Sequence, residues 1–209
     1  MACMDRALAL SRRLGSAVAD ERVLRAIAAV PRERFVDERD RDRAYENVAL
    51  PIDCEQTISQ PVVVARMLEL LELRPGDRVL DVGTGSGYHA ALLSLLAAEV
   101  WTIERHAKLS VTAQLVLEEV GIENVTCVVG DGWRGLPEQA PFDAINVAAA
   151  TGPEVPPALE RQLAPSGRMV VPVGARRQRL VRVWRAPDGL RRERLDPVRF
   201  VPLVPDLKD

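Results

Sequence analysis

Residues 78–88 read Arg-Val-Leu-Asp-Val-Gly-Thr-Gly-Ser-Gly-Tyr, an apolar and largely β-branched run that leads into three glycines at alternate positions. The run is typical of a buried strand. Glycines let the backbone turn sharply and approach a ligand closely, and the first residues of a following helix offer unpaired N–H groups. This segment therefore predicts a strand, a ligand-binding turn and a helix in succession.

Strand-like and helix-like segments alternate through the next ninety residues. Such alternation is typical of a parallel sheet covered by helices. It predicts an α/β fold with a doubly wound, mostly parallel, Rossmann-like sheet and helices on both faces. The expected strands are Arg78–Val82, Glu99–Ile103, Val125–Val129, Ala144–Val147 and Met169–Val173, and the expected helices are Tyr88–Ala97, Ala107–Val120 and Pro156–Leu163.

The flanking segments predict an N-terminal helical extension and a C-terminal β-hairpin. Residues 4–30 carry apolar side chains at helical spacing, which indicates one or two amphipathic helices, and a charged stretch, 32–43, is expected to be a solvated helix or turn. A helix over 62–73 is expected to begin at Pro61 with Ser59 or Gln60 as its cap. Two strand-like runs, 180–184 and 190–195, flank Asp188-Gly189, a hairpin signal, and a proline-rich extended piece, 198–204, is expected to complete the sheet.

Length and composition favour one globular domain. The 209 residues are read as a single unit with helices and an active loop in 1–75, the α/β core in 76–174 and strands in 175–209. A net charge of −2 gives no overall field for nucleic acid or an anionic membrane. The longest apolar run is too short for a membrane span, no secretory signal is present, and the three cysteines lack metal or disulfide spacing. We expect a cytoplasmic protein, with a monomer favoured, that binds no metal, nucleic acid or membrane.

Two acidic residues indicate the kind of ligand. Glu104 ends the second core strand, about 20 residues after the glycines, where a carboxylate can bind both ribose hydroxyls. Asp131 ends the third strand, where it can approach an adenine amino group or cap the next turn. The segment has no lysine, which disfavours a phosphate-binding loop for ATP or GTP, and Tyr88 replaces the small residue of the dinucleotide fingerprint, which disfavours NAD. The pattern favours a nucleoside ligand without phosphates.

These residues resemble the cofactor motifs of class I S-adenosylmethionine-dependent methyltransferases. Within that superfamily, several further segments resemble protein-L-isoaspartate O-methyltransferases. The segments are Val30–Val36, Ala44-Tyr45, Leu50–Ile52, Gln56–Pro61 and Pro197–Leu203. The resemblance implies transfer of a methyl group from S-adenosyl-L-methionine to the α-carboxylate of isoaspartyl residues in proteins or peptides. The products would be S-adenosyl-L-homocysteine and a methyl ester that collapses to succinimide, as in protein repair.

The same resemblance implies roles for individual residues. Ser59 corresponds to the active-site serine, whose hydroxyl can orient the carboxylate or the cofactor. The implied substrate residues are Pro51, Ile52, Gln56, Ala148 and Val201. The implied cofactor residues are Thr57, Ile58, Ser59, Asp81, Gly83, Thr84, Gly85, Gly87, Glu104, Asp131 and Gly132.

The sequence departs from the family pattern beside the active loop. Cys54-Glu55, which follows Asp53, stands where a Tyr-Gly pair is usual, and we expect the negative charge of Asp53 and Glu55 to favour substrates with basic residues nearby. After the fourth core strand, Val147-Ala148-Ala149-Ala150 stands where Val-Thr-Ala-Ala is usual, and Asn146 places an amide in an otherwise apolar strand. His89 and His106 are interpreted as surface or supporting residues, because the carboxylate is already ionised and no general base is required.

Other functions stay open at this point. A relative dedicated to one partner peptide in natural-product biosynthesis would look similar. Eight arginines between Arg176 and Arg194 could bind phosphates in a nucleic-acid methyltransferase, although no Pro-Pro-aromatic loop for a flipped base follows the fourth strand. A small-molecule methyltransferase and a binding module that keeps the cofactor but has lost turnover are the remaining alternatives.

Overall fold

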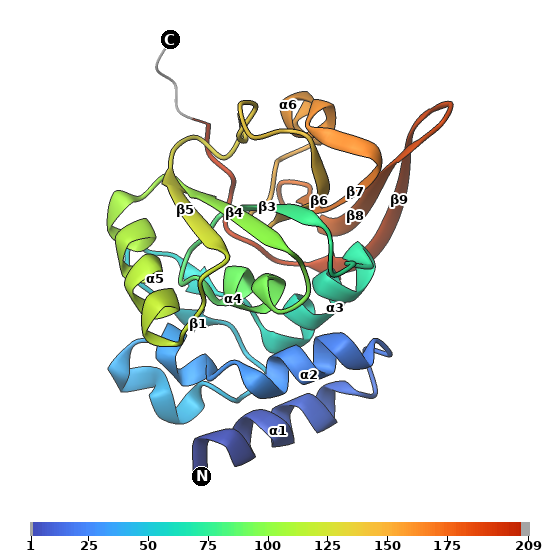
Figure 1. Ribbon diagram of the computed structural model, residues 1–209. Helices are drawn as coiled ribbons and strands as arrows, with labels where there is room; N and C mark the ends of the chain where they lie inside the picture. The colour runs from blue at the N-terminus through green and yellow to red at the C-terminus, as the bar shows by residue number, and fades with distance from the viewer. Residues whose placement is uncertain (1, 206–209) are drawn as a thin grey trace.

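The computed structural model describes residues 2–205 and contains one large sheet between two layers of other structure (Figure 1). The sheet has seven strands in the order β5-β4-β3-β6-β7-β8-β9. Its strands are β3 (Arg78–Val82), β4 (Glu99–Glu104), β5 (Val125–Val129), β6 (Phe142–Val147), β7 (Leu163–Val173), β8 (Gln178–Ala186) and β9 (Gly189–Val198). The first five are parallel, and β8 and β9 are antiparallel. The expected doubly wound sheet is confirmed.

Helices cover one face of the sheet in two shells. The inner helices pack on the strands, and the two N-terminal helices lie outside them (Figure 1). The inner helices are α3 (Pro61–Leu71), α4 (Tyr88–Ser94) and α5 (Ala107–Glu119), and the outer ones are α1 (Ala2–Leu14) and α2 (Glu21–Ala29). The short helix α6 (Pro157–Arg161) lies on the opposite face.

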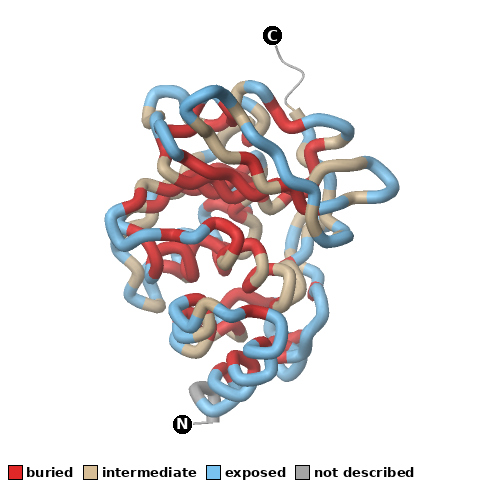
Figure 2. Tube along the Cα trace, turned by 90° about the vertical axis from the view of Figure 1, so that its right-hand side faces the viewer, coloured by how far each residue is buried: buried red, intermediate tan, exposed pale blue. Residues whose placement is uncertain are grey.

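Two apolar clusters hold these layers together. The larger one joins the N-terminal helices, α3 and α4 to one face of the sheet, and the smaller one joins α6 to the other face. Buried residues concentrate along the strands and the inner helix faces, while the outer helices and the β8–β9 hairpin expose long stretches (Figure 2). No helix within residues 2–205 is long and apolar enough to cross a membrane.

The charged stretch after Pro31 differs from expectation. It forms two 3-10 helices, Arg32–Phe35 and Glu38–Arg43, and these are not uniformly solvated. The Arg32 side chain is fully buried and that of Asp40 is nearly so. Arg32 is buried because two backbone carbonyls and an aromatic ring surround its guanidinium, partners that a charge pattern does not reveal.

Two further expectations are wrong in detail. Gln60 occupies the N-cap position of α3, as expected for one of the two candidates, but its side chain makes no capping hydrogen bond. Instead, the Asn47 side-chain oxygen accepts the N–H of Val62 at 3.0 Å. The segment 198–204 does not complete the sheet, since β9 ends at Val198 and the chain then crosses the carboxyl edge of the strands. There Ala150 exchanges backbone hydrogen bonds with Val201 and Leu203, both at 2.8 Å. The intervening proline, which has no N–H, fits this single bridge better than a ladder.

Candidate active site

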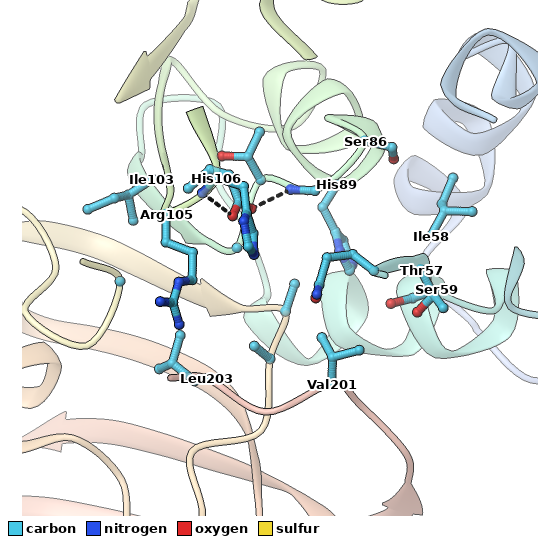
Figure 3. Close-up of a pocket in the computed structure, with 18 of the residues that line it drawn as sticks. Thr57, Ile58, Ser59, Ser86, His89, Ile103, Arg105, His106, Val201 and Leu203 are labelled. Carbon is cyan, nitrogen blue, oxygen red and sulfur yellow. Dashed lines mark hydrogen bonds between the residues drawn. The ribbon is translucent and has the colours of Figure 1, made fainter. Parts of the chain in front are cut away.

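The main pocket lies at the carboxyl ends of β3, β4 and β6. From β3, the sheet extends through β4 and β5 on one side and through β6 and β7 on the other, so the strand order reverses next to β3. Open α/β sheets bind ligands at this position. The walls of the pocket come from the turns after β3 and β4, from residues 56–59 and from the C-terminal segment 201–204 (Figure 3). Segments far apart in the sequence therefore meet at one site.

The glycine turn forms the floor of this pocket. Gly83 and Gly85 adopt positive φ values of 91° and 52°, which favour glycine, and Gly83 N–H donates to the Ile103 carbonyl at 2.9 Å. A Cβ at Gly132 would lie 2.7 Å from a Val82 methyl, so this neighbouring turn also requires a bare backbone. Thr84 lines the pocket and hydrogen-bonds Thr102 beneath it. The cradle can take a ligand against its main chain.

Glu104 is the acidic group of the pocket. Its carboxylate accepts the Gly85 N–H through one oxygen and the His106 N–H through the other, both at 3.0 Å (Figure 3). These bonds fix a carboxylate that is 6% exposed and still has lone pairs directed to further donors. The geometry suits the two hydroxyls of a ribose.

Asp81 lies under the pocket rather than in its lining. Its neighbours across the parallel ladder are Thr102 on β4 and Asn146 on β6. Thr102 donates to one carboxylate oxygen at 2.9 Å and Asn146 to the other at 2.8 Å. Complete burial raises the pKa of Asp81 to about 7. The Asn146 amide, which looks out of place in an apolar strand, is therefore the partner of Asp81.

Asp131 caps the turn that follows β5. Its side chain accepts the Trp133 N–H at 2.8 Å and lies within ion-pair distance of Arg134. The next residue, Gly132, lines the pocket, and Asp131 stands beside the pocket rather than in its lining. Of the two roles considered for Asp131, the structure displays the cap.

The active loop is held by a two-stranded ladder. Strands β1 (Leu50–Pro51) and β2 (Thr57–Ile58) pair antiparallel and present residues 56–59 to the pocket. The buried Arg32 donates to the Ser59 carbonyl at 2.9 Å and so anchors the residue that follows β2. Gln56, Thr57, Ile58 and Ser59 thus line the pocket, as the sequence predicts for a site loop.

A second cavity of about 740 Å³ adjoins the first. Thr57, Ser59, Ala148 and Val201 line both cavities, so they form the boundary between them. Among the described residues that line this groove, Arg199 is the charged one. Of the expected substrate residues, Ala148 and Val201 reach the groove and Gln56 the pocket, whereas Pro51 and Ile52 line neither. Gly87 also lies outside the lining, as the residue before α4.

The negative charges beside the loop do not face either cavity. Asp53 pairs with Lys108 at 2.9 Å, and neither Asp53 nor Glu55 is a lining residue. The expectation that these charges favour basic substrates required them to face the substrate, and the geometry contradicts that premise. Arg199 is the charged residue in the described lining of the groove.

Sequence reasoning underrated several lining residues. His89 is 7% exposed and lines the pocket, and burial together with Arg32 lowers its pKa to about 4. Its position after the glycine turn, on the pocket side of α4, was the available signal. His106 and Arg105 also line the pocket next to Glu104, and Leu203 and Val204 close it from the C-terminal segment.

No cluster of three or more His, Cys, Asp or Glu side chains within the described ranges is placed to hold a metal ion. The residues present suit an S-adenosyl ligand instead. A bare glycine cradle, a fixed carboxylate for a diol and an unpartnered buried imidazole all face one pocket.

Comparisons with known proteins agree with this site. The family model described as Protein-L-isoaspartate(D-aspartate) O-methyltransferase matches residues 5–208. A protein-L-isoaspartate O-methyltransferase of Koribacter versatilis is 52% identical over 203 residues, which cover 96% of this chain and 91% of the relative. One of Parvibaculum lavamentivorans is 55% identical over 191 residues, covering 90% and 86%.

Solved structures give the same result. A structure titled protein-L-isoaspartate O-methyltransferase superposes with a TM-score of 0.85 at 31% identity and covers 98% of this chain and 67% of its own. A putative one from Plasmodium falciparum, in complex with S-adenosyl-L-homocysteine, has a TM-score of 0.82 at 25% identity and covers 95% and 98%. The chain belongs to the protein-L-isoaspartate(D-aspartate) O-methyltransferase family and is an S-adenosylmethionine-dependent enzyme with the Rossmann-like methyltransferase fold.

Proposed function

We propose that this protein methylates the free α-carboxylate of L-isoaspartyl residues in many different damaged proteins and peptides, as a repair enzyme. The observation that carries the proposal is the shared boundary of the two cavities. Thr57, Ser59, Ala148 and Val201 touch both the pocket suited to a nucleoside and the open groove beside it. A carboxylate on a peptide in the groove would reach this boundary, where Ser59 can donate its hydroxyl proton.

The chain's own residues have a limited chemical task. S-adenosylmethionine supplies, when bound, a methyl group activated by a positively charged sulfur. An α-carboxylate has a pKa of about 3.5 and is ionised at pH 7, so no protein group needs to remove a proton. Glu104 and the glycine turn hold the cofactor, Ser59 orients the carboxylate, and the lining of the pocket limits the access of water. His89, neutral at pH 7, is not required as a base.

The groove favours a broad substrate range over one dedicated peptide. Near Arg199 its lining consists of valine, proline and phenylalanine, and its side-chain donors and acceptors are Thr57, Ser59, Gln60 and Arg199, which offers little for reading a peptide sequence. We also propose that the protein acts in the cytoplasm as a monomer without nucleic acid, which cell fractionation and light scattering would check.

The decisive experiment is methyl transfer to matched peptides. The protein is mixed with labelled S-adenosylmethionine and several unrelated peptides, each made with either L-isoaspartate or L-aspartate. Base-labile methyl ester should form on every isoaspartyl peptide and on none of the aspartyl controls. Ser59→Ala should lower kcat by at least tenfold with the affinity for S-adenosylhomocysteine within about threefold of the unchanged protein, as expected for loss of one orienting hydrogen bond. Methylation of one peptide alone would favour a dedicated enzyme, and methylation of none would contradict the proposal.

A further inference from the structure

Three buried polar atoms lie close together at one end of the pocket with no conventional hydrogen bond: Nη1 of Arg32, the hydroxyl of Tyr88 and Nε2 of His89. Arg32 and Tyr88 interact with each other, which leaves Nε2 of His89 as the one of the three without a partner among the described residues. The Arg32 guanidinium lies 4.8 Å from the centre of the Tyr88 ring, and its charge acts on His89, so the three side chains form one cluster. Buried polar atoms without partners are rare, and one at the wall of a pocket indicates that a ligand group binds there.

No carboxylate of the described residues forms an ion pair with Arg32, although the Glu33 carboxylate is close enough to act on Tyr88. Arg32 is completely buried, and its guanidinium donates to the carbonyls of Ala44 at 2.8 Å and Ser59 at 2.9 Å. Burying a cation without a counter-ion is costly, so an anion bound nearby would be stabilised.

His89 is the member of the cluster that also has a place at the pocket wall. It points toward Thr57 and Ser59 at one end of the pocket, whereas Ile103, Arg105 and Leu203 stand at the other end (Figure 3). Gly132, which follows β5, lies at that other end, because a Cβ on it would be 3.3 Å from Leu203. The adenosine-binding elements after β4 and β5 therefore occupy the end opposite His89.

The two ends of S-adenosylmethionine differ in charge. Its adenine is uncharged, and its amino-acid end carries a carboxylate and an ammonium group. With the adenosine bound at Glu104, the amino-acid end of the cofactor would lie on the side of His89, near the buried Arg32 guanidinium. We propose that His89 binds the amino-acid carboxylate of the cofactor by donating a hydrogen bond from Nε2, with the buried Arg32 charge favouring the anion.

The protonation state of His89 is consistent with this role. Burial and Arg32 lower its pKa to about 4, so the ring is neutral at pH 7 and carries one N–H. A neutral donor can bind a carboxylate tightly without adding a second buried cation beside Arg32. No proton is transferred, so the same bond serves the cofactor and its demethylated product.

A test can separate this bond from all others by changing the ligand. S-adenosylhomocysteine has the amino-acid carboxylate, and 5′-methylthioadenosine lacks the amino-acid group but keeps the adenosine and the sulfur. Calorimetry would measure both dissociation constants for the unchanged protein, His89→Leu and His89→Gln. His89→Leu should weaken S-adenosylhomocysteine by about 10- to 100-fold, the effect of losing a hydrogen bond to a charged group, with methylthioadenosine within about twofold. His89→Gln keeps an N–H donor and should recover most of the affinity.

The outcomes divide cleanly. An equal loss for both ligands in His89→Leu would mean that His89 only shapes the pocket, and an unchanged affinity for S-adenosylhomocysteine would mean that the carboxylate lies elsewhere. Either result overturns the proposal. The inference rests on the proposed use of the pocket for the cofactor. It does not depend on the isoaspartyl substrate, because the binding experiment contains no peptide. Failure of the unchanged protein to bind S-adenosylhomocysteine would refute the cofactor assignment itself, which is a distinguishable result.

Discussion

Replacing Asp81 by asparagine should change how the stability of the protein depends on pH. The Asp81 pKa is raised from its ordinary 3.8 to about 7 by burial, so the folded state holds a proton that the unfolded state releases. The stabilising effect of that proton is fully present below pH 3.8 and is lost as the pH rises through 7. The asparagine side chain in Asp81→Asn cannot ionise, and it keeps an oxygen that can accept a hydrogen bond from Asn146.

The size of the effect follows from the pKa difference. Each unit of difference is worth about 1.4 kcal/mol, so the full range corresponds to about 4 kcal/mol, of which about 3 kcal/mol falls between pH 4.5 and pH 8. The free energy of unfolding of Asp81→Asn minus that of the unchanged protein should therefore rise by about 3 kcal/mol over this interval. His89, whose pKa is lowered, destabilises the fold as the pH falls below about 6.5, but it acts equally in both proteins and cancels in the difference.

Urea unfolding followed by circular dichroism at pH 4.5, 6, 7 and 8 would measure the two free energies. Asp188→Asn is the matched control, because Asp188 is an exposed residue whose side chain pairs with Arg191 at the surface. Its difference from the unchanged protein should vary by less than 1 kcal/mol. A flat difference for Asp81→Asn as well would refute the reasoning and imply that Asp81 is ionised in the folded protein.

Four further outcomes are expected. Glu104→Ala should weaken S-adenosylhomocysteine binding by about 1.5–3 kcal/mol in calorimetry, and an unchanged affinity would contradict its role. In Asp81→Asn, where residue 81 cannot ionise, kcat should be nearly constant from pH 6 to 8, because the substrate carboxylate is ionised and His89 is neutral over this range. A bell-shaped pH profile centred near pH 6.5 would implicate a histidine. At low salt, isoaspartyl peptides flanked by Glu should have a lower KM than those flanked by Lys, and Arg199→Gln should remove this difference. Equal KM values in the unchanged protein would mean that Arg199 does not contact the peptide. Glu55→Gly should raise the free energy of unfolding by about 0.5–1 kcal/mol, because Glu55 has a φ of 58°, and a loss of stability would show that its side chain is needed.

The parallel core was predictable because its signals are local. Each strand from Arg78 to Val147 is a short apolar run, and each functional residue after it comes at the carboxyl end. Parallel strands present these ends at one edge of the sheet, so Gly83, Glu104 and Gly132 had to meet in space. The strand pattern, the glycine turn and the acidic residues at the strand ends together predict the floor of the pocket, whereas the loop 56–59 is expected from the family resemblance.

The residues that sequence reasoning misjudged depend on distant partners. Arg32 sits in a charged run that is typical of a solvated surface, and it is buried by carbonyls 12 and 27 residues further along the chain. Asn146 was interpreted as an anomaly because its partner, Asp81, lies 65 residues before it. The segment 198–204 is extended, as its prolines predict. The prolines do not predict that this segment crosses the carboxyl ends of the strands.

The departure at Cys54-Glu55, after Asp53, shows that a charge pattern does not reveal where the charged side chains lie. Cys54 and Glu55 are the central residues of a turn in which both φ values are positive, at 57° and 58°. This geometry matches the twist of a short hairpin but favours glycine or asparagine. The turn is held by the Ile52 N–H on the Gln56 carbonyl at 2.9 Å and the Gln56 N–H on the Asp53 carbonyl at 3.1 Å. Lys108 pairs with Asp53, and both acids lie outside the lining of the groove, so the feature that the structure displays here is a pair of residues other than glycine at positive φ in the loop that carries Ser59.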